Sequence, residues 1–182
     1  MFMSAEYGNA QTALMLLTLL QYALMAYAAW RDARTRTFSN VLAAAFVIVC
    51  AAVAFCAGGI TDLSVSDGMG GLQDGGFLVA SGLKALIKNA IAANVVFALL
   101  YVFELIWRRL RREPGLGMGD LKFLFALMLA EPFKALMSFI IGLIALAFTG
   151  AITRKSSFPL LPFMVGAYFT ILLVGFFVTF DM

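Results

Sequence analysis

Hydrophobic residues occur along this chain in long runs, which short polar, charged or glycine-rich stretches separate. Most of the runs approach the roughly 20 apolar residues that an α-helix needs to cross a lipid bilayer. The runs cover residues 12–30, 41–57, 89–107, 120–131, 133–153 and 158–179. The pattern therefore predicts an all-α polytopic membrane protein, with about six transmembrane helices in a single membrane-embedded domain, residues 1–182.

The third apolar stretch is too long for one crossing. It begins near Phe77, and as one helix it would reach about 46 Å at 1.5 Å per residue, against a hydrocarbon core of about 30 Å. Ser81, Lys84 and Lys88 share one helical face in its first third. We therefore expect an interfacial amphipathic helix there, followed by a transmembrane helix that begins near Asn89.

The fourth run is short, because Glu131-Pro132 follows it directly. It either crosses the bilayer with local thinning or forms a re-entrant half-helix. Positive residues gather in short loops on the cytoplasmic side of a membrane. Six crossings with the N-terminus outside place the arginine-rich loops, together with Arg154 and Lys155, on that side, whereas a re-entrant segment would move Arg154 and Lys155 outside. We therefore favour six crossings, with the acidic, glycine-rich stretch at residues 58–76 outside.

The composition agrees with a membrane setting. The 182 residues are 63% hydrophobic and 13% charged, which excludes a soluble domain whose surface is covered by charge. The net charge is only +3, so we expect the surface to meet a lipid bilayer and no nucleic acid. The first run follows a segment with Glu6 and no basic residue, so we expect it to be retained and not removed as a signal peptide.

Histidine is absent from the sequence, which removes several classes of chemistry. A histidine general base, a His-Glu-x-x-His zinc site, a haem held by histidine and a Ser-His pair are all excluded. Cys50 and Cys56 do not form a Cys-x-x-Cys pattern, so we expect them to be small packing residues. We therefore expect no metal and no cofactor, and acid–base chemistry carried by carboxylates, with lysine as the weaker candidate.

Two aspartates stand where an apolar run meets a basic loop. Asp32 follows the first run, and Asp120 follows Gly117 and Gly119 in the sequence Gly-Met-Gly-Asp-Leu-Lys. A carboxylate at the edge of the hydrocarbon is costly to keep, which favours a functional pair over two ordinary loop aspartates. The glycines allow tight backbone geometry at membrane depth without a side chain in the way. Because two nearby carboxylates cannot both ionise cheaply, they share a proton, and the pair can both activate water and act as an acid.

Glu104 is a third acid inside an apolar run, four residues before Arg108. This spacing favours an ion pair between the two side chains near the membrane interface. A contact with a substrate is the alternative role for Glu104.

Three stretches of the chain resemble the type IV prepilin peptidases, a family of membrane aspartyl peptidases with a Gly-x-Gly-Asp motif. They run from Asp32 to Asn40, from Gly117 to Lys122 and from Pro159 to Phe163, and the resemblance extends over essentially the whole chain. The resemblance implies catalytic aspartates at Asp32 and Asp120. It places Gly117, Gly119, Lys122, Arg36 and Asn40 in supporting positions.

The chain departs from the family pattern in two places. Phe38-Ser39 replaces the usual Ile-Pro before Asn40, which leaves the start of that helix less rigid. The cytosolic insert with paired Cys-x-x-Cys motifs is missing. The resemblance therefore implies a short, peptidase-only form without N-methyltransferase activity, of the kind associated with tight-adherence pilus or archaeal-type filament systems.

The resemblance also implies a location and a substrate class. The protein would be an endopeptidase of the inner (cytoplasmic) membrane whose active site faces the cytoplasm. Its substrates would be prepilin or pseudopilin-like proteins, in which a short basic leader ending in a small residue such as glycine precedes an apolar helix. Glu104 and Glu113 are candidate contacts for the basic leader.

Two other functions would use the same residues. A transporter or another ion-coupled membrane protein would bind a cation or relay protons through Asp32 and Asp120. An inactive assembly factor on the same fold is the third candidate.

Overall fold

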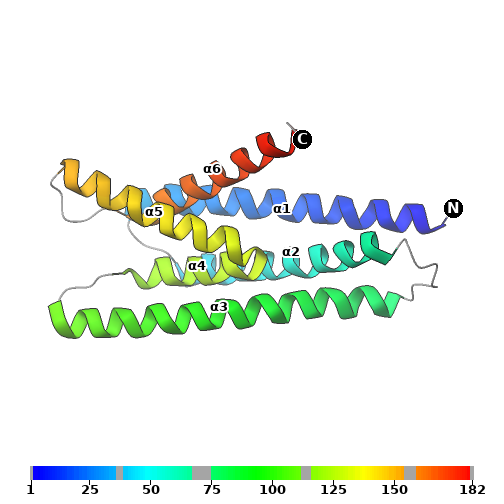
Figure 1. Cartoon of the computed structure of the whole chain (residues 1–182), viewed down its shortest axis with the longest axis horizontal. Coiled ribbons are helices and arrows are strands. Elements are labelled where there is room, and N and C mark those ends of the chain that lie inside the picture. Colours follow the sequence, from blue (N-terminus) through cyan, green and yellow to red (C-terminus); the bar gives the residue numbers. More distant parts are fainter. Residues whose placement is uncertain (1, 36–38, 67–74, 112–115, 154–158, 181–182) are drawn as a thin grey trace.

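The computed structural model describes residues 2–35, 39–66, 75–111, 116–153 and 159–180, and within these residues the regular secondary structure is entirely α-helical. The helices form one elongated bundle (Figure 1). They are α1 (Phe2–Thr35), α2 (Asn40–Ser66), α3 (Gly75–Arg111), α4 (Met118–Ala130), α5 (Pro132–Thr153) and α6 (Leu161–Phe180). Within the described ranges, five of these helices, all except α4, are long and apolar enough to cross a membrane. The prediction of an all-α polytopic membrane protein is confirmed.

The helices alternate in direction along the bundle. Helices α1, α3 and α5 end, and α2, α4 and α6 begin, at one end of the bundle, which we call the Thr35 end (left in Figure 1). Helix α4 runs inward from the Thr35 end, and α5 returns to it. Helix α4 is not among the five helices long enough to cross a membrane, so the choice between six crossings and a re-entrant fourth segment stays a prediction. Arg154 and Lys155 themselves lie outside the described residues.

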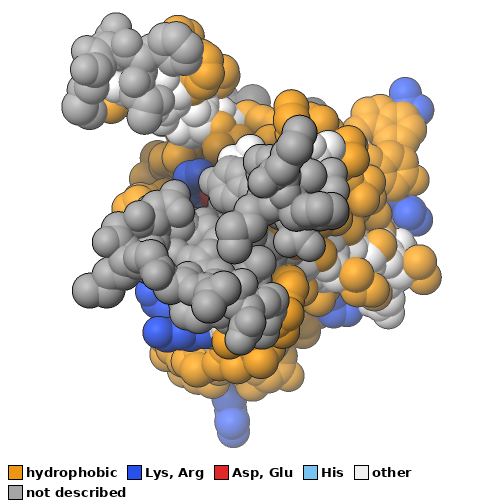
Figure 2. Space-filling view, turned by 90° about the vertical axis from the view of Figure 1, so that its right-hand side faces the viewer, with side chains coloured by type: hydrophobic (Ala, Val, Ile, Leu, Met, Phe, Trp, Pro, Cys, Tyr) orange, Lys and Arg blue, Asp and Glu red, His pale blue; other side chains and the backbone are white. Residues whose placement is uncertain are grey.

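Many large apolar side chains are exposed on the bundle. Figure 2, viewed from the end opposite to the Thr35 end, shows apolar side chains around the edge of that end. On α3 they recur at every fourth position, which keeps them on one face of the helix. Exposed members of this stripe are Leu83, Ile87, Ile91, Val95 and Leu99. In water an apolar stripe of this length would promote association, whereas in a bilayer it is the surface that meets the lipid.

The short helix α4 forms the centre of the bundle. It contacts α2, α3 and α5. Its buried residues are Leu121, Phe123, Leu124, Ala126, Leu127, Met128, Leu129 and Ala130. Phe123 stacks on Phe46 of α2 with ring centroids 4.9 Å apart, and Phe125 meets Phe97 of α3 edge to face at 5.8 Å. Helix α4 is apolar around most of its circumference because other helices surround it.

Polar side chains fill the break between α4 and α5. Glu131 Oε1 lies 2.8 Å from Lys134 Nζ, and Glu131 Oε2 accepts a hydrogen bond of 2.7 Å from the hydroxyl of Tyr168 on α6. Pro132 has no amide hydrogen to donate to α4, so the helix cannot continue regularly through it. The hydrogen bond between Glu131 and Tyr168 therefore connects the junction of α4 and α5 to α6.

Helix α3 is continuous, so the structure does not separate an interfacial helix from a transmembrane helix near Asn89. The reason is the close packing of its first third against α2. A Cβ on Gly82 would lie 2.6 Å from the carbonyl oxygen of Phe55, and a Cβ on Gly58 would lie 2.5 Å from the Cβ of Ala85. Small residues let two helix backbones approach closely in a membrane protein. This part of α3 therefore follows α2 instead of leaving the bundle at an angle.

The same contact extends α2 beyond its predicted end. The sequence predicted the second span to stop at residue 57 and a glycine-rich loop to cover residues 58–76, but α2 continues to Ser66. Gly58 lies inside the helix, at a point where α3 approaches closely. Glycine at this position is a packing residue and not a helix terminator. Residues 67–74 of the predicted loop lie outside the described residues.

Candidate active site

Asp32 lies in the last turn of α1, at the Thr35 end of the bundle. Only 7% of the residue is exposed, and its oxygen Oδ2 is inaccessible to solvent. The neighbouring Arg34 is exposed and lies over the ring of Trp30, 4.8 Å from the ring centroid. A carboxyl group buried inside the bundle is costly unless its surroundings compensate it. The burial of Asp32 therefore does not fit an ordinary loop aspartate.

Asp120 lies in the first turn of α4, and its carboxyl group folds back over Gly117. Gly117 precedes the helix with φ −69° and ψ 136°, and its amide donates a hydrogen bond to the Asp120 carboxyl. A Cβ at position 117 would lie 2.8 Å from Asp120 Oδ2, closer than real Cβ contacts allow. The backbone angles are ordinary, so Gly117 is needed for the space it leaves and not for an unusual φ. Gly119, in the same turn, is half-buried.

The structure brings Asp32 and Asp120 together from helices that are distant in the sequence. Burial and, second to it, the nearby Asp32 carboxyl group raise the pKa of the Asp120 carboxyl, and the Gly117 amide opposes the rise, so that the pKa of Asp120 becomes about 7. Asp120 belongs to α4, which is not one of the five long helices suited to cross the membrane. Since Asp120 holds a proton near neutral pH beside a second acid, the two carboxyl groups meet the requirement for a proton-sharing pair.

The start of α2 is held by three polar contacts near this pair. Lys122 Nζ donates a hydrogen bond of 2.8 Å to Asn40 Oδ1, which joins α4 to α2. Ser39 Oγ accepts a hydrogen bond of 3.3 Å from the amide of Leu42, and Arg31 donates to the same oxygen at 3.4 Å. Ser39 is therefore a side-chain cap of α2. The sequence suggested a less rigid helix start without proline, and this cap supplies a different means of fixing it.

Glu104 is buried in α3, with 2% of the residue exposed. Its Oε1 lies 2.6 Å from Arg108 Nε, which confirms the predicted ion pair, and its Oε2 accepts a hydrogen bond of 2.6 Å from the amide of Leu116. These contacts and this burial suit a structural residue better than a contact for a basic leader. Arg36 and Glu113, the other residues proposed to assist or to bind a substrate, lie outside the described residues.

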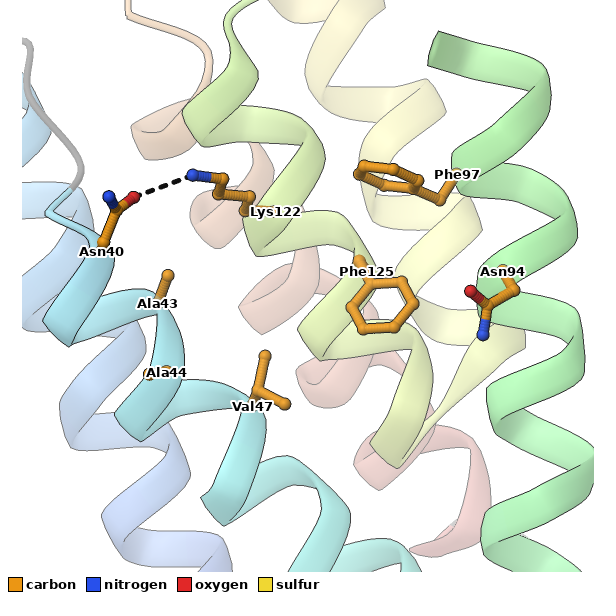
Figure 3. Close-up of a pocket in the computed structure, with 8 residues that line it drawn as sticks. All are labelled: Asn40, Ala43, Ala44, Val47, Asn94, Phe97, Lys122 and Phe125. Carbon is orange, nitrogen blue, oxygen red and sulfur yellow. Dashed lines mark hydrogen bonds between the residues drawn. The ribbon is translucent and has the colours of Figure 1, made fainter.

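An apolar groove of about 400 Å³ opens between α2 and α3, with α4 as its floor (Figure 3). Its lining residues are Asn40, Ala43, Ala44, Val47, Asn94, Phe97, Lys122 and Phe125. Sequence reasoning found Asn40 and Lys122 but missed the others, of which only Asn94 stands out as a polar residue in an apolar run. Lys122 lies about 200° around α4 from Asp120, at 100° per residue. The groove therefore opens on a different side of α4 from the carboxyl pair.

A pair of carboxyl groups of which one is protonated and the other ionised can move protons and activate a water molecule. The helix N-terminus beside Asp120 supplies amide groups that favour negative charge there. In comparisons with protein-family models, curated proteins and solved structures, nothing matches this chain.

Proposed function

We propose that this chain is a membrane aspartyl endopeptidase that removes the short basic leader of prepilin-like substrates. The observation that carries the proposal is the pairing of Asp32 with Asp120, in which burial and the second acid raise the pKa of Asp120 to about 7. Perturbed pairs of acids are characteristic of sites that perform acid–base chemistry. The resemblance of the Asp32 and Gly117-x-Gly119-Asp120 stretches to prepilin peptidases supports the substrate class.

The mechanism assigns a separate role to each carboxyl group. Asp120 holds the shared proton and donates it to the carbonyl oxygen of the scissile peptide as water attacks, which gives a gem-diol. When the C–N bond breaks, the leaving amine receives the proton that Asp32 has taken from the water, and Asp120 recovers a proton from a gem-diol hydroxyl. Asp32 in its ionised form accepts a proton from the attacking water. Each of these transfers needs a heavy-atom separation of hydrogen-bond length, about 2.6–3.2 Å. The positions of the two carboxyl groups relative to each other must therefore be closely maintained.

The position of the pair supports cleavage at a membrane surface. Asp32 lies in the last turn of α1 and Asp120 in the first turn of α4, both at the Thr35 end of the bundle. Arginine-rich sequence ends both α1 and α3 at this end, and positive residues favour the cytoplasmic side. In our proposal the site therefore faces the cytoplasm from the inner membrane, where the basic leader of a substrate would lie.

The ion-coupled alternative uses the same two acids, and a pKa near 7 also suits a proton relay. Acids in a transport path lie near the middle of the membrane, where the substrate site of a transporter forms. Both aspartates lie at helix ends instead. The peptidase is therefore the stronger candidate. Because the insert with paired Cys-x-x-Cys motifs is missing, we propose no N-methyltransferase activity.

Cleavage of a defined reporter tests the proposal. The reporter carries a short lysine-rich leader ending in glycine, followed by an apolar helix, and it is co-reconstituted with the purified protein in lipid nanodiscs. We expect a product whose new N-terminus begins directly after the glycine and is unmethylated. A second reporter, in which bulky leucine replaces this glycine, is the matched control and should remain uncleaved.

A negative result is informative when paired with a proton-flux assay. If neither the reporter nor candidate prepilins co-expressed with the chain are cleaved, the peptidase proposal fails. Proton or cation flux through vesicles, lost in the Asp120→Asn variant, would then favour the ion-coupled function. Absence of both activities would favour the assembly factor.

A further inference from the structure

The position of α4 determines where Asp120 lies, and both ends of α4 are held by polar side chains of one neighbouring helix. At the start, the amide of Leu116 donates a hydrogen bond of 2.6 Å to Glu104 Oε2 on α3. At the end, Asn89 on α3 donates its side-chain amide to the carbonyl oxygens of Leu129 and Ala130, at 2.9 and 3.3 Å. Helix α3 therefore contacts α4 by specific hydrogen bonds at two separate points.

The contact of Asn89 falls where a helix lacks its own partners. The last four carbonyl groups of an α-helix have no intrahelical amide to accept from, and inside a bundle such groups are costly to leave unsatisfied. Asn89 serves two of these carbonyls, at positions 129 and 130. At the other end, Arg108 fixes the Glu104 carboxylate by the 2.6 Å ion pair. Asn89 therefore satisfies carbonyl groups at the end of α4. Arg108 holds the Glu104 carboxylate in place to accept from the amide of Leu116.

The spacing of the two contacts matches on both helices. Asn89 and Glu104 are separated by about four helical turns of α3, or roughly 22 Å at 1.5 Å per residue. Helix α4 rises by roughly 18 Å from Met118 to Ala130, and Leu116 precedes it by two non-helical residues, so its two contact points lie a similar length apart. The helices run in opposite directions, so that the later residue of α3 meets the start of α4. A slip of α4 by one residue would move it by about 1.5 Å and break both contacts together.

We propose that Glu104 and Asn89 are positioning residues, which hold α4 in axial register on α3 and thereby keep Asp120 opposite Asp32. This inference rests on the proposed function, because it assigns the two side chains a role in aligning the acid pair. Displacements of about 1 Å in a catalytic group can cost about 100-fold in rate. These contacts of Glu104 and Asn89 with the two ends of α4, which we call the clamp, explain why a helix as short as α4 keeps a defined position.

The test compares Asn89→Ala, Glu104→Ala and Glu104→Gln with Asn94→Ala. Asn94 is the matched control, since among the described residues its amide donates within α3, to the carbonyl of Ala90 at 2.8 Å, and the groove that it lines opens on a different side of α4 from the acid pair. Glutamine at 104 keeps an oxygen that can accept from Leu116, so it is the conservative rescue variant. For Asn89→Ala and Glu104→Ala we expect kcat to fall by about 10- to 100-fold with KM little changed, and for the other two less than a threefold change.

A second readout does not need cleavage. Infrared titration follows the Asp120 carboxyl, identified by the band that Asp120→Asn removes. In Asn89→Ala and Glu104→Ala, α4 slips and Asp120 moves away from Asp32, so we expect the midpoint pH of the Asp120 titration to fall below that of the wild type. Asn94→Ala should leave this midpoint unchanged. An inserted Asn89→Ala variant with a wild-type midpoint and wild-type kcat would overturn the clamp, even if Glu104→Ala fails to insert. A shifted midpoint in a protein that cleaves no reporter would retain the clamp and reject the peptidase.

Discussion

The Asp120 carboxyl group lies so close to Gly117 that a Cβ at position 117 would come within 2.8 Å of Asp120 Oδ2. The same glycine donates its backbone amide to that carboxyl. One residue therefore supplies both a hydrogen-bond donor and the space that the carboxyl group occupies. This relationship accounts physically for the first glycine of the Gly-x-Gly-Asp sequence.

The Gly117→Ala variant should lose most of its cleavage activity while remaining inserted in the membrane. The added methyl group forces the Asp120 carboxyl to rotate away, which breaks the amide hydrogen bond and the alignment with Asp32. We expect kcat for the reporter to fall at least about tenfold, by analogy with other small displacements of catalytic groups. Gly166→Ala is the control, because a Cβ on Gly166 would meet nothing within 4 Å. Equal activity in the two variants would show that the contact with Gly117 is unimportant.

Asp32→Asn and Asp120→Asn should each abolish cleavage and leave the protein as abundant in the membrane as the wild type. The amide keeps the size of the carboxyl group but cannot ionise or share the proton. Loss of one acid–base group typically costs about 10² to 10⁴ in rate, measured here with the glycine-ending reporter. Asp62→Asn, near the opposite end of α2, should cleave normally. Near-normal cleavage by either variant of the pair would exclude an aspartyl mechanism.

The hydrophobic pattern predicted the helical membrane fold because span length and apolar composition are local properties of the sequence. It placed a loop at residues 58–76 and a boundary near Asn89, whereas α2 continues to Ser66 and α3 is unbroken at Asn89. Helix continuity there depends on Gly58 and Gly82, which bring the two backbones together. That contact joins residues of two different helices, so no window along the sequence reveals it.

The residues of the candidate site also differ in how far the sequence alone reveals them. Asp32 and Asp120 are conspicuous in the sequence, because each is an acid at the edge of an apolar run. The role of Asn89 depends on carbonyl groups that lie 40 residues further along the chain, and an isolated asparagine carries no sign of such a partner. Sequence also left two roles open for Glu104, and the structure supplies the ion pair with Arg108 and adds the amide of Leu116.

Cysteine labels should distinguish the alternating arrangement from a re-entrant one. Thr35 and Thr153 are exposed and end α1 and α5 at the same end of the bundle. A membrane-impermeant thiol reagent should therefore reach Thr35→Cys and Thr153→Cys only from the cytoplasmic side. It should reach Asp67→Cys only from outside. The background carries Cys50→Ala and Cys56→Ala, and labelling of positions 35 and 153 from opposite sides would rule out the alternating order.

The raised pKa of Asp120 predicts a characteristic dependence of stability on pH. Its carboxyl changes from an ordinary value of 3.8 to about 7 in the folded protein, first through burial and then through Asp32. The folded state therefore binds a proton that the unfolded chain releases, so the free energy of unfolding decreases as pH rises between about 4 and 7. Below that window both states are protonated, and above it both are ionised, so the contribution of Asp120 levels off.

Thermal unfolding of the detergent-solubilised protein across this window measures the effect. We expect the Tm of the wild type to fall with rising pH more steeply than that of Asp120→Asn, because asparagine imitates the protonated acid and cannot titrate. Asp62→Asn should keep the wild-type slope, which separates Asp120 from a general change in net charge. Parallel curves for the wild type and Asp120→Asn would mean that Asp120 titrates in its ordinary range, and Asp120 would then not hold the proton that the proposed mechanism assigns to it.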